Sequence, residues 1–168
     1  MKVPPKRQWR VAASSGDPQL AVDDSYATAW TAEEADNSWL EIDLGAVATL
    51  GGLEVYWGER APAKYRFASS LDGEAWSEIC RTRHGEGGQD VFAFPPVATR
   101  FVRWRSEDPP TERGPEIVEI NLYAPEDAAS VREAGRLAAL GHAAVTIPEG
   151  ESITVDFGAL RSPLGAAW

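Results

Sequence analysis

The chain has 168 residues, a formal net charge of −10 and a pI near 4.7, which fits one domain with some additional residues. The acidic balance excludes binding to nucleic acid or to an anionic membrane surface, because both require clustered Lys and Arg. A single cysteine, Cys80, excludes an internal disulfide and a zinc site built from several Cys ligands. The 43% of hydrophobic residues supply a core, and 15 glycines with 12 prolines indicate many turns.

Short strands separated by turns are predicted from Trp9 to Tyr123. Apolar and polar residues alternate in 38–45, 50–58, 64–70, 77–83, 90–96, 100–106 and 115–123. Turns recur about every 8–12 residues, which is typical of an antiparallel sandwich or barrel. Cys80 lies within one of these strands and is therefore expected to be a buried structural thiol. The tryptophans at positions 30, 39, 76 and 104 are expected to fill the core.

The pattern changes after Tyr123. A helical linker is predicted over 125–142, with Ser130 as its N-cap and Glu133 completing a capping box. The tail at 152–165 then repeats features of 38–52, including an Asp followed by an apolar residue, Gly and Ala. This repeat predicts that 143–168 is the start of a second, truncated β module. The alternative is a last hairpin of the first domain.

The loop 21–30 concentrates oxygen donors. Asp23, Ser25 and Thr28 offer a carboxylate, hydroxyls and loop carbonyls, which are the hard ligands that Ca²⁺ prefers. A single carboxylate would leave a weak site, so a second acid is needed, and Glu119 is the candidate. The alternative is a polar turn, since Asp, Ser and Thr also hydrogen-bond to their own backbone.

Five motifs occur in order between residues 9 and 124. They are A-x-D-D-x-x-x-T-x-W at 21–30, W-x-x-I-D-L-G at 39–45, S-x-D-G-x-x-W at 70–76, R-F-V-R at 100–103 and E-I-x-L-Y at 119–123. Together they resemble the discoidin, or coagulation factor V/VIII type C, domain and its bacterial carbohydrate-binding relatives. The resemblance implies an all-β fold, an eight-stranded antiparallel jelly-roll sandwich over 9–124.

The resemblance also implies a structural calcium ion in the loop. The side chains of Asp23, Thr28 and Glu119 would bind it, and the carbonyls near Leu20, Ser25 and Val118 would complete the shell. Asp24 stands where the family usually has glycine. If the glycine serves a positive φ, Asp tolerates that conformation better than most residues.

The sugar site of the galactose-binding relatives is only partly matched. Those relatives place a His directly after the loop Trp, an aromatic residue three positions later, and an Arg after the second core strand. Here Thr31 and Glu34 stand at the first two positions, and Arg60 matches the third. Trp57, at a strand end, is either core or part of the ligand site. The alternative for Arg60 is a loop arginine paired with Glu59 or Asp72.

The function expected from these features is a non-catalytic, carbohydrate-binding module. Its partner would be a glycan or cell-surface polysaccharide, and its parent a secreted multidomain bacterial protein such as a glycoside hydrolase. The basic opening lacks an apolar stretch and is no signal peptide, so we expect a piece of a longer protein with covalently linked neighbours. The alternative is a protein-interaction or spacer domain without a sugar site.

Overall fold

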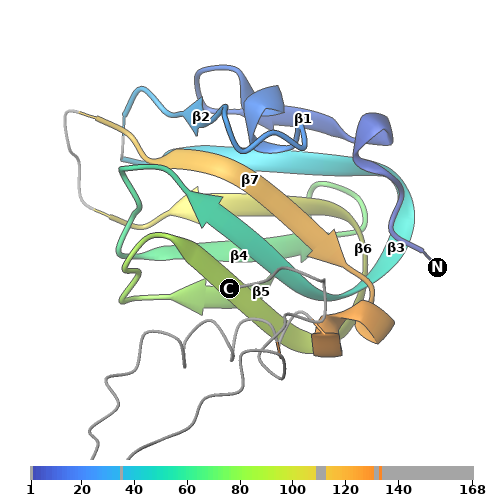
Figure 1. Cartoon of the computed structure of the whole chain (residues 1–168). Helices are drawn as coiled ribbons and strands as arrows, with labels where there is room; N and C mark the ends of the chain where they lie inside the picture. Colours follow the sequence, from blue (N-terminus) through green and yellow to red (C-terminus); the bar gives the residue numbers. More distant parts are fainter. Residues whose placement is uncertain (1, 35, 109–112, 131–132, 134–168) are drawn as a thin grey trace, which may run out of the picture.

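The computed structural model describes residues 2–34, 36–108, 113–130 and 133. Seven strands dominate it (Figure 1): β1 Arg10–Ala13, β2 Trp30–Thr31, β3 Trp39–Trp57, β4 Tyr65–Ser70, β5 Ser77–Thr82, β6 Gln89–Ser106 and β7 Glu116–Tyr123. Two 3-10 helices, η1 Lys6–Gln8 and η2 Pro18–Ala21, precede β2. Every strand pairing is antiparallel. The expected all-β class is therefore confirmed.

Two long strands, β3 and β6, each run through both layers of the sandwich. The first half of β3 pairs with β1 and with the second half of β6, whereas its second half pairs with β7. Register shifts between Asp43 and Ala48 bend the ribbon there, and Gly45 adopts a φ of 79°. The sequence predicted 38–45 and 50–58, and likewise 90–96 and 100–106, as separate strands. Each pair is one strand because a bulge turns the chain without ending the ladder.

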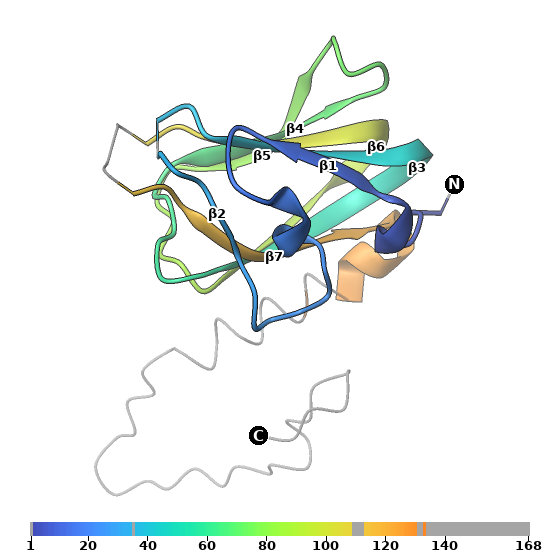
Figure 2. The same ribbon diagram turned by 90° about the horizontal axis from the view of Figure 1, so that it is seen from above.

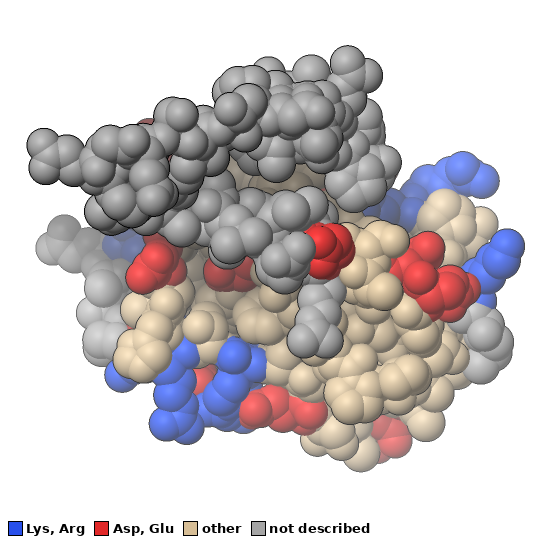
Figure 3. All heavy atoms as spheres, turned by 60° about the horizontal axis from the view of Figure 1, so that its bottom comes forward, with Lys and Arg blue, Asp and Glu red and all other residues tan. Residues whose placement is uncertain are grey.

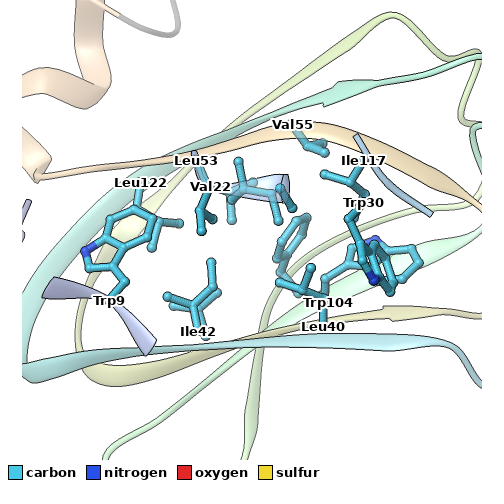
Figure 4. Close-up of a cluster of buried hydrophobic side chains, with 14 of the residues drawn as sticks. Trp9, Val22, Trp30, Leu40, Ile42, Leu53, Val55, Trp104, Ile117 and Leu122 are labelled. Carbon is cyan, nitrogen blue, oxygen red and sulfur yellow. The ribbon is translucent and has the colours of Figure 1, made fainter. Parts of the chain in front are cut away.

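The core lies between the two layers (Figure 4). One layer runs β1–β3–β6–β4–β5 and the other β2–β7–β3–β6. Trp30 and Trp104 are buried at its centre as expected, with ring centroids 5.7 Å apart in an edge-to-face contact. Trp76 was expected in the core as well, but it is only half-buried. The Asp72–Gly73 turn places Trp76 on the outer face of the layer instead, where Arg103 covers its ring.

The N-terminal segment packs over one edge of the sandwich. Residues 2–34 lie at the top of Figure 1 and face the viewer in Figure 2. Lys2–Lys6 and Trp9 approach the end of β7 and residues 124–127, and together these segments line a hollow of about 510 Å³. The beginning and the end of the domain therefore meet without a disulfide.

The segment after β7 begins with a helix at Pro125. Residues 125–130 are helical, and the N–H groups of Asp127 and Ala128 both donate to the carbonyl of Ala124 at 3.0 Å. Ser130 is therefore inside the helix, and the prediction that it is the N-cap is wrong, because proline at the first position already begins the helix. The rest of the linker and the predicted β module at 143–168 lie outside the described residues. None of the described helices has the length and hydropathy of a membrane span.

Candidate functional site

The loop that connects η2 to β2 closes on the carboxylate of Asp23. Its Oδ1 accepts from the backbone N–H of Ser25 at 3.0 Å, and its Oδ2 accepts from the hydroxyl of Thr28 at 2.6 Å. The same hydroxyl lies 3.3 Å from the carbonyl oxygen of Ser25. Carboxylate, hydroxyl and carbonyl oxygens thus gather within one short turn. Both expected features, the polar turn and the oxygen donor set, are present in this loop.

Asp24 occupies the left-handed region of backbone conformation, with a φ of 59°. The position that the family usually fills with glycine therefore does demand a positive φ here. Aspartate is among the few other residues that adopt it readily. Asp24 thus adopts the conformation that glycine would adopt most easily.

Glu119 lies on β7 and is completely buried, at 0% exposure. Burial raises the pKa of its carboxyl group, Lys6 opposes that change, and the negative charges of Asp24 and Asp23 add to it. The charges of the loop thus influence Glu119 electrostatically. One oxygen of Glu119, Oε2, has no hydrogen-bond partner in the described structure.

The ammonium group of Lys6, from η1, provides the nearby positive charge. It contacts Oε1 of Glu119 and lies 2.8 Å from Oδ1 of Asp24. Only 13% of the Lys6 side chain is exposed, whereas that of Asp24 is 74% exposed. The sequence analysis missed Lys6, because nothing in a basic N-terminal segment indicates which distant carboxylate it will meet.

The oxygen donors of this loop are of the kind that calcium prefers, and the Lys6 ammonium lies beside two of the nearby carboxylates. Asp23, Thr28 and Ser25 supply hard donors, and the unpaired oxygen of Glu119 is free to accept a cation. Leu20 lies on η2 and Val118 is the neighbour of Glu119 on β7. Within the described ranges, no three Asp, Glu, His or Cys side chains converge, so a metal here would depend on hydroxyl and carbonyl oxygens.

A second site, the rim hollow, lies at one end of the sandwich. It measures about 250 Å³ and is lined by Glu59, Arg60, Ala61, Pro62, Ser106, Asp108, Arg113, Gly114 and Pro115. The Nε of Arg60 donates to the carbonyl of Gly114 at 3.1 Å, and its Nη2 lies 2.6 Å from a carboxylate oxygen of Glu116. The pairing expected with Glu59 or Asp72 is therefore replaced by one with Glu116. These contacts hold the guanidinium of Arg60 at the hollow.

Gly114 allows the rim to close against the segment after β2. A Cβ at this position would lie 2.2 Å from the carbonyl oxygen of Ala32, so only glycine fits. Thr31 is exposed and pairs with Glu116 in the ladder between β2 and β7. Glu34 is exposed too. Arg60 and Thr31 thus both lie next to Glu116.

Trp57 belongs to the core. It is 6% exposed, its ring centroid lies 4.9 Å from that of Tyr65, and its Nε1 donates to Asp90 at 2.8 Å. A sugar platform requires an exposed ring face, which Trp57 does not offer. The assignment of Trp57 to the ligand site is therefore corrected, because the alternation along β3 turns its side chain inward.

Comparisons with known proteins extend these observations. The chain resembles the chitosan-binding module 1 of a chitosanase/glucanase from Paenibacillus sp. IK-5, with 23% identity, a TM-score of 0.66, and coverage of 74% of this chain and 99% of that module. It also resembles CpGH89CBM32-5 from Clostridium perfringens, solved with GalNAc-β-1,3-galactose, at 17% identity and a TM-score of 0.64, covering 74% of this chain and all of that one. At these identities the likeness shows the shared fold.

A curated relative is the polysaccharide lyase 8 family protein HylA of Enterococcus faecalis, 34% identical over 100 residues. The match covers 58% of this chain and 7% of that protein's length. The family profile described as "F5/8 type C domain" matches residues 7–120, well over half of the chain. The five motifs, the bent-strand sandwich and this match agree, and the chain belongs to the F5/8 type C domain family.

Proposed function

We propose that the chain is a non-catalytic module that binds a carbohydrate. The observation that carries the proposal is the rim hollow, where Arg60 is fixed by Gly114 and Glu116 on a fold shared with sugar-binding modules. Solved relatives include two chitosan-binding modules, one of them in complex with chitotriose, and a family 32 module in complex with galactose. Catalysis would reside in other domains of a parent protein.

The rim hollow suits a small, weakly held saccharide. A guanidinium carries donors in a fixed fork that can reach adjacent hydroxyl groups, and Arg60 is already oriented. Among the described residues, the lining contains Ala61, Pro62 and Pro115 but no aromatic ring, so these residues offer the apolar face of a sugar little stacking surface. Affinity would be modest, and attachment to a catalytic domain or a second module would raise the effective concentration.

We infer an extracytoplasmic, multidomain parent for this module. The polysaccharide lyase relative is far longer than the matched stretch, which supports attachment to an enzyme that acts on glycans. The glycan partner would then be a polysaccharide outside the cell. The full sequence of the parent, with any leader and catalytic domain, tests this inference directly.

We further infer that the loop at Asp23 binds a structural Ca²⁺ when Lys6 is displaced from Glu119. Asp23, Thr28 and Glu119 would contribute side chains, and Leu20, Ser25 and Val118 carbonyls. The ion would neutralise the buried carboxylate of Glu119 and tie the loop to β7. The support for this is the clustered loop oxygens and the unpaired Oε2 of Glu119.

A glycan array followed by calorimetry tests the sugar proposal. Wild type is compared with Arg60→Ala and with a matched control, Arg7→Ala, which removes an exposed arginine from η1. We expect binding of a saccharide at millimolar concentration and at least a ~10-fold loss in Arg60→Ala alone. If no saccharide binds at about 10 mM, the protein-interaction or spacer function is favoured instead.

A further inference from the structure

A row of basic side chains crosses the outer face of the β5–β4–β6–β3 layer. Arg105 of β6 pairs with Arg66 of β4, and Arg66 pairs in turn with Arg81 of β5. On the other side of Arg105 lies Trp39 of β3. The chain as a whole carries ten more acidic than basic residues. Like charges directly opposite each other on neighbouring strands are destabilising unless acidic side chains or a bound anion compensate them.

The acidic side chains on this face are already engaged. Arg81 holds Glu78 through two hydrogen bonds of 2.8 and 2.5 Å and also lies 3.4 Å from Glu107. The Nε of Arg66 is 3.6 Å from Glu107, and 39% of the Arg66 side chain is exposed. Figure 3 shows another part of the described surface, where basic and acidic side chains also lie next to one another.

Arg103 is also engaged. Its Nε and Nη2 both donate to one oxygen of Glu41, at 3.0 and 2.7 Å. Arg105, two residues further along β6, differs from its neighbours. Among the described residues, its guanidinium has neither a carboxylate nor a hydrogen-bond partner.

A hollow of about 250 Å³, here called the sheet hollow, opens beside Arg105. Its lining consists of Arg66, Ala68, Trp76, Glu78, Arg103 and Arg105, none of which belongs to the rim hollow. The guanidinium of Arg103 lies 3.9 Å from the ring centroid of Trp76, and the indole N–H of Trp76 donates to the carbonyl of Gly73 at 3.1 Å. The ring is therefore held in place at the wall. The volume is below the ~300–1,000 Å³ of drug-sized sites, so it suits one or two sugar rings.

We propose that the sheet hollow binds the carboxylate of an acidic saccharide, a chain that contains uronic acid residues. Arg105 and Arg66 supply two guanidinium groups on adjacent strands, and guanidinium matches a carboxylate in shape as well as charge. Trp76, whose ring Arg103 contacts, still lines the hollow and supplies apolar surface there for a sugar ring, which an acidic peptide would not require. The bound carboxylate also relieves the repulsion between the paired arginines. This inference rests on the proposed carbohydrate-binding function but uses a different site.

Calorimetric titration with an oligogalacturonate tests the proposal. The variants are Arg105→Gln and Arg66→Gln in the sheet hollow, Arg60→Gln in the rim hollow, and Arg7→Gln as an exposed control. We expect the oligogalacturonate to bind wild type, and each sheet-hollow substitution to weaken binding ~10-fold or more. Arg7→Gln, the exposed control, should bind as wild type does, and Arg60→Gln reports separately on the rim hollow. The carboxyl-reduced oligomer, which is neutral, should not compete.

Several outcomes would overturn the inference. Absence of oligogalacturonate binding would overturn it. Loss of binding in Arg60→Gln but not in Arg105→Gln would also overturn it, although that result would still support the rim hollow. Equal binding of polyglutamate would mean that the arginines attract any polyanion. Because Arg105 faces a like charge, Arg105→Gln should melt at the same temperature as wild type or higher. A clearly lower melting temperature would mean that Arg105 is structural.

Discussion

Replacing Lys6 by Met removes the positive charge beside a buried carboxylate. The side chain of Glu119 is 1% exposed, so water cannot take over the role of the ammonium. Breaking a buried ion pair by deleting one partner costs about 3–5 kcal/mol, because the remaining charge is left uncompensated. Lys6 is itself slightly exposed, so we expect the lower end of that range, about 3 kcal/mol. For a domain of this size, that lowers the melting temperature by roughly 10 °C.

Thermal and urea unfolding of wild type, Lys6→Met and the matched control Lys2→Met measure this effect. Lys2 is exposed, so Lys2→Met should melt as wild type does. The double variant Lys6→Met/Glu119→Gln has no charge at either position, and its free energy of unfolding should return to within about 1 kcal/mol of wild type. A Lys6→Met protein that melts within about 2 °C of wild type would refute the claim that Lys6 neutralises Glu119.

Adding Ca²⁺ to the same variants tests whether Ca²⁺ and the Lys6 ammonium group compete for Glu119. With Met at position 6, Ca²⁺ no longer competes with an ammonium for Glu119. At a dissociation constant of about 0.1 mM, about 10 mM Ca²⁺ would stabilise the fold by about 2.7 kcal/mol. We expect Lys6→Met to gain more than wild type, and EDTA to reverse the gain. No response in Lys6→Met, or the same response in Lys6→Met/Asp23→Ala, would remove calcium from this loop.

Two further predictions concern the sandwich. Burial raises the pKa of the Cys80 thiol to about 12, so a thiol reagent at neutral pH should label it only after unfolding, and fast labelling of the folded protein would contradict its burial. The side chain of Arg100 lowers the pKa of Asp43 below 3.8, so the pair's stabilisation is present above pH 3.8 and disappears as the pH falls through the lower folded value. Arg100→Gln should therefore lose stability in urea unfolding at neutral pH but not in strong acid. The same deficit at both pH values would assign it to packing.

The sequence alone was sufficient for the class of fold. Alternating apolar residues between turns determine that the strands bury one face each, and that requires two packed layers. The motif around Asp23 and Thr28 also located the oxygen-rich loop, because its hydrogen bonds are local. Asp24 has the positive φ that a replacement for glycine required.

Only the tertiary structure decided which charges meet. Lys6 and Glu119 are 113 positions apart, and a 3-10 turn places one against the buried face that carries the other. Arg60 pairs with Glu116 and not with a local acid, the side chain of Trp57 lies in the core, and Arg105 lies opposite Arg66. Each of these depends on strand register, which assigns every side chain to a face and a neighbour. Local patterns determine which faces are buried, whereas the register between distant strands determines the sites built on them.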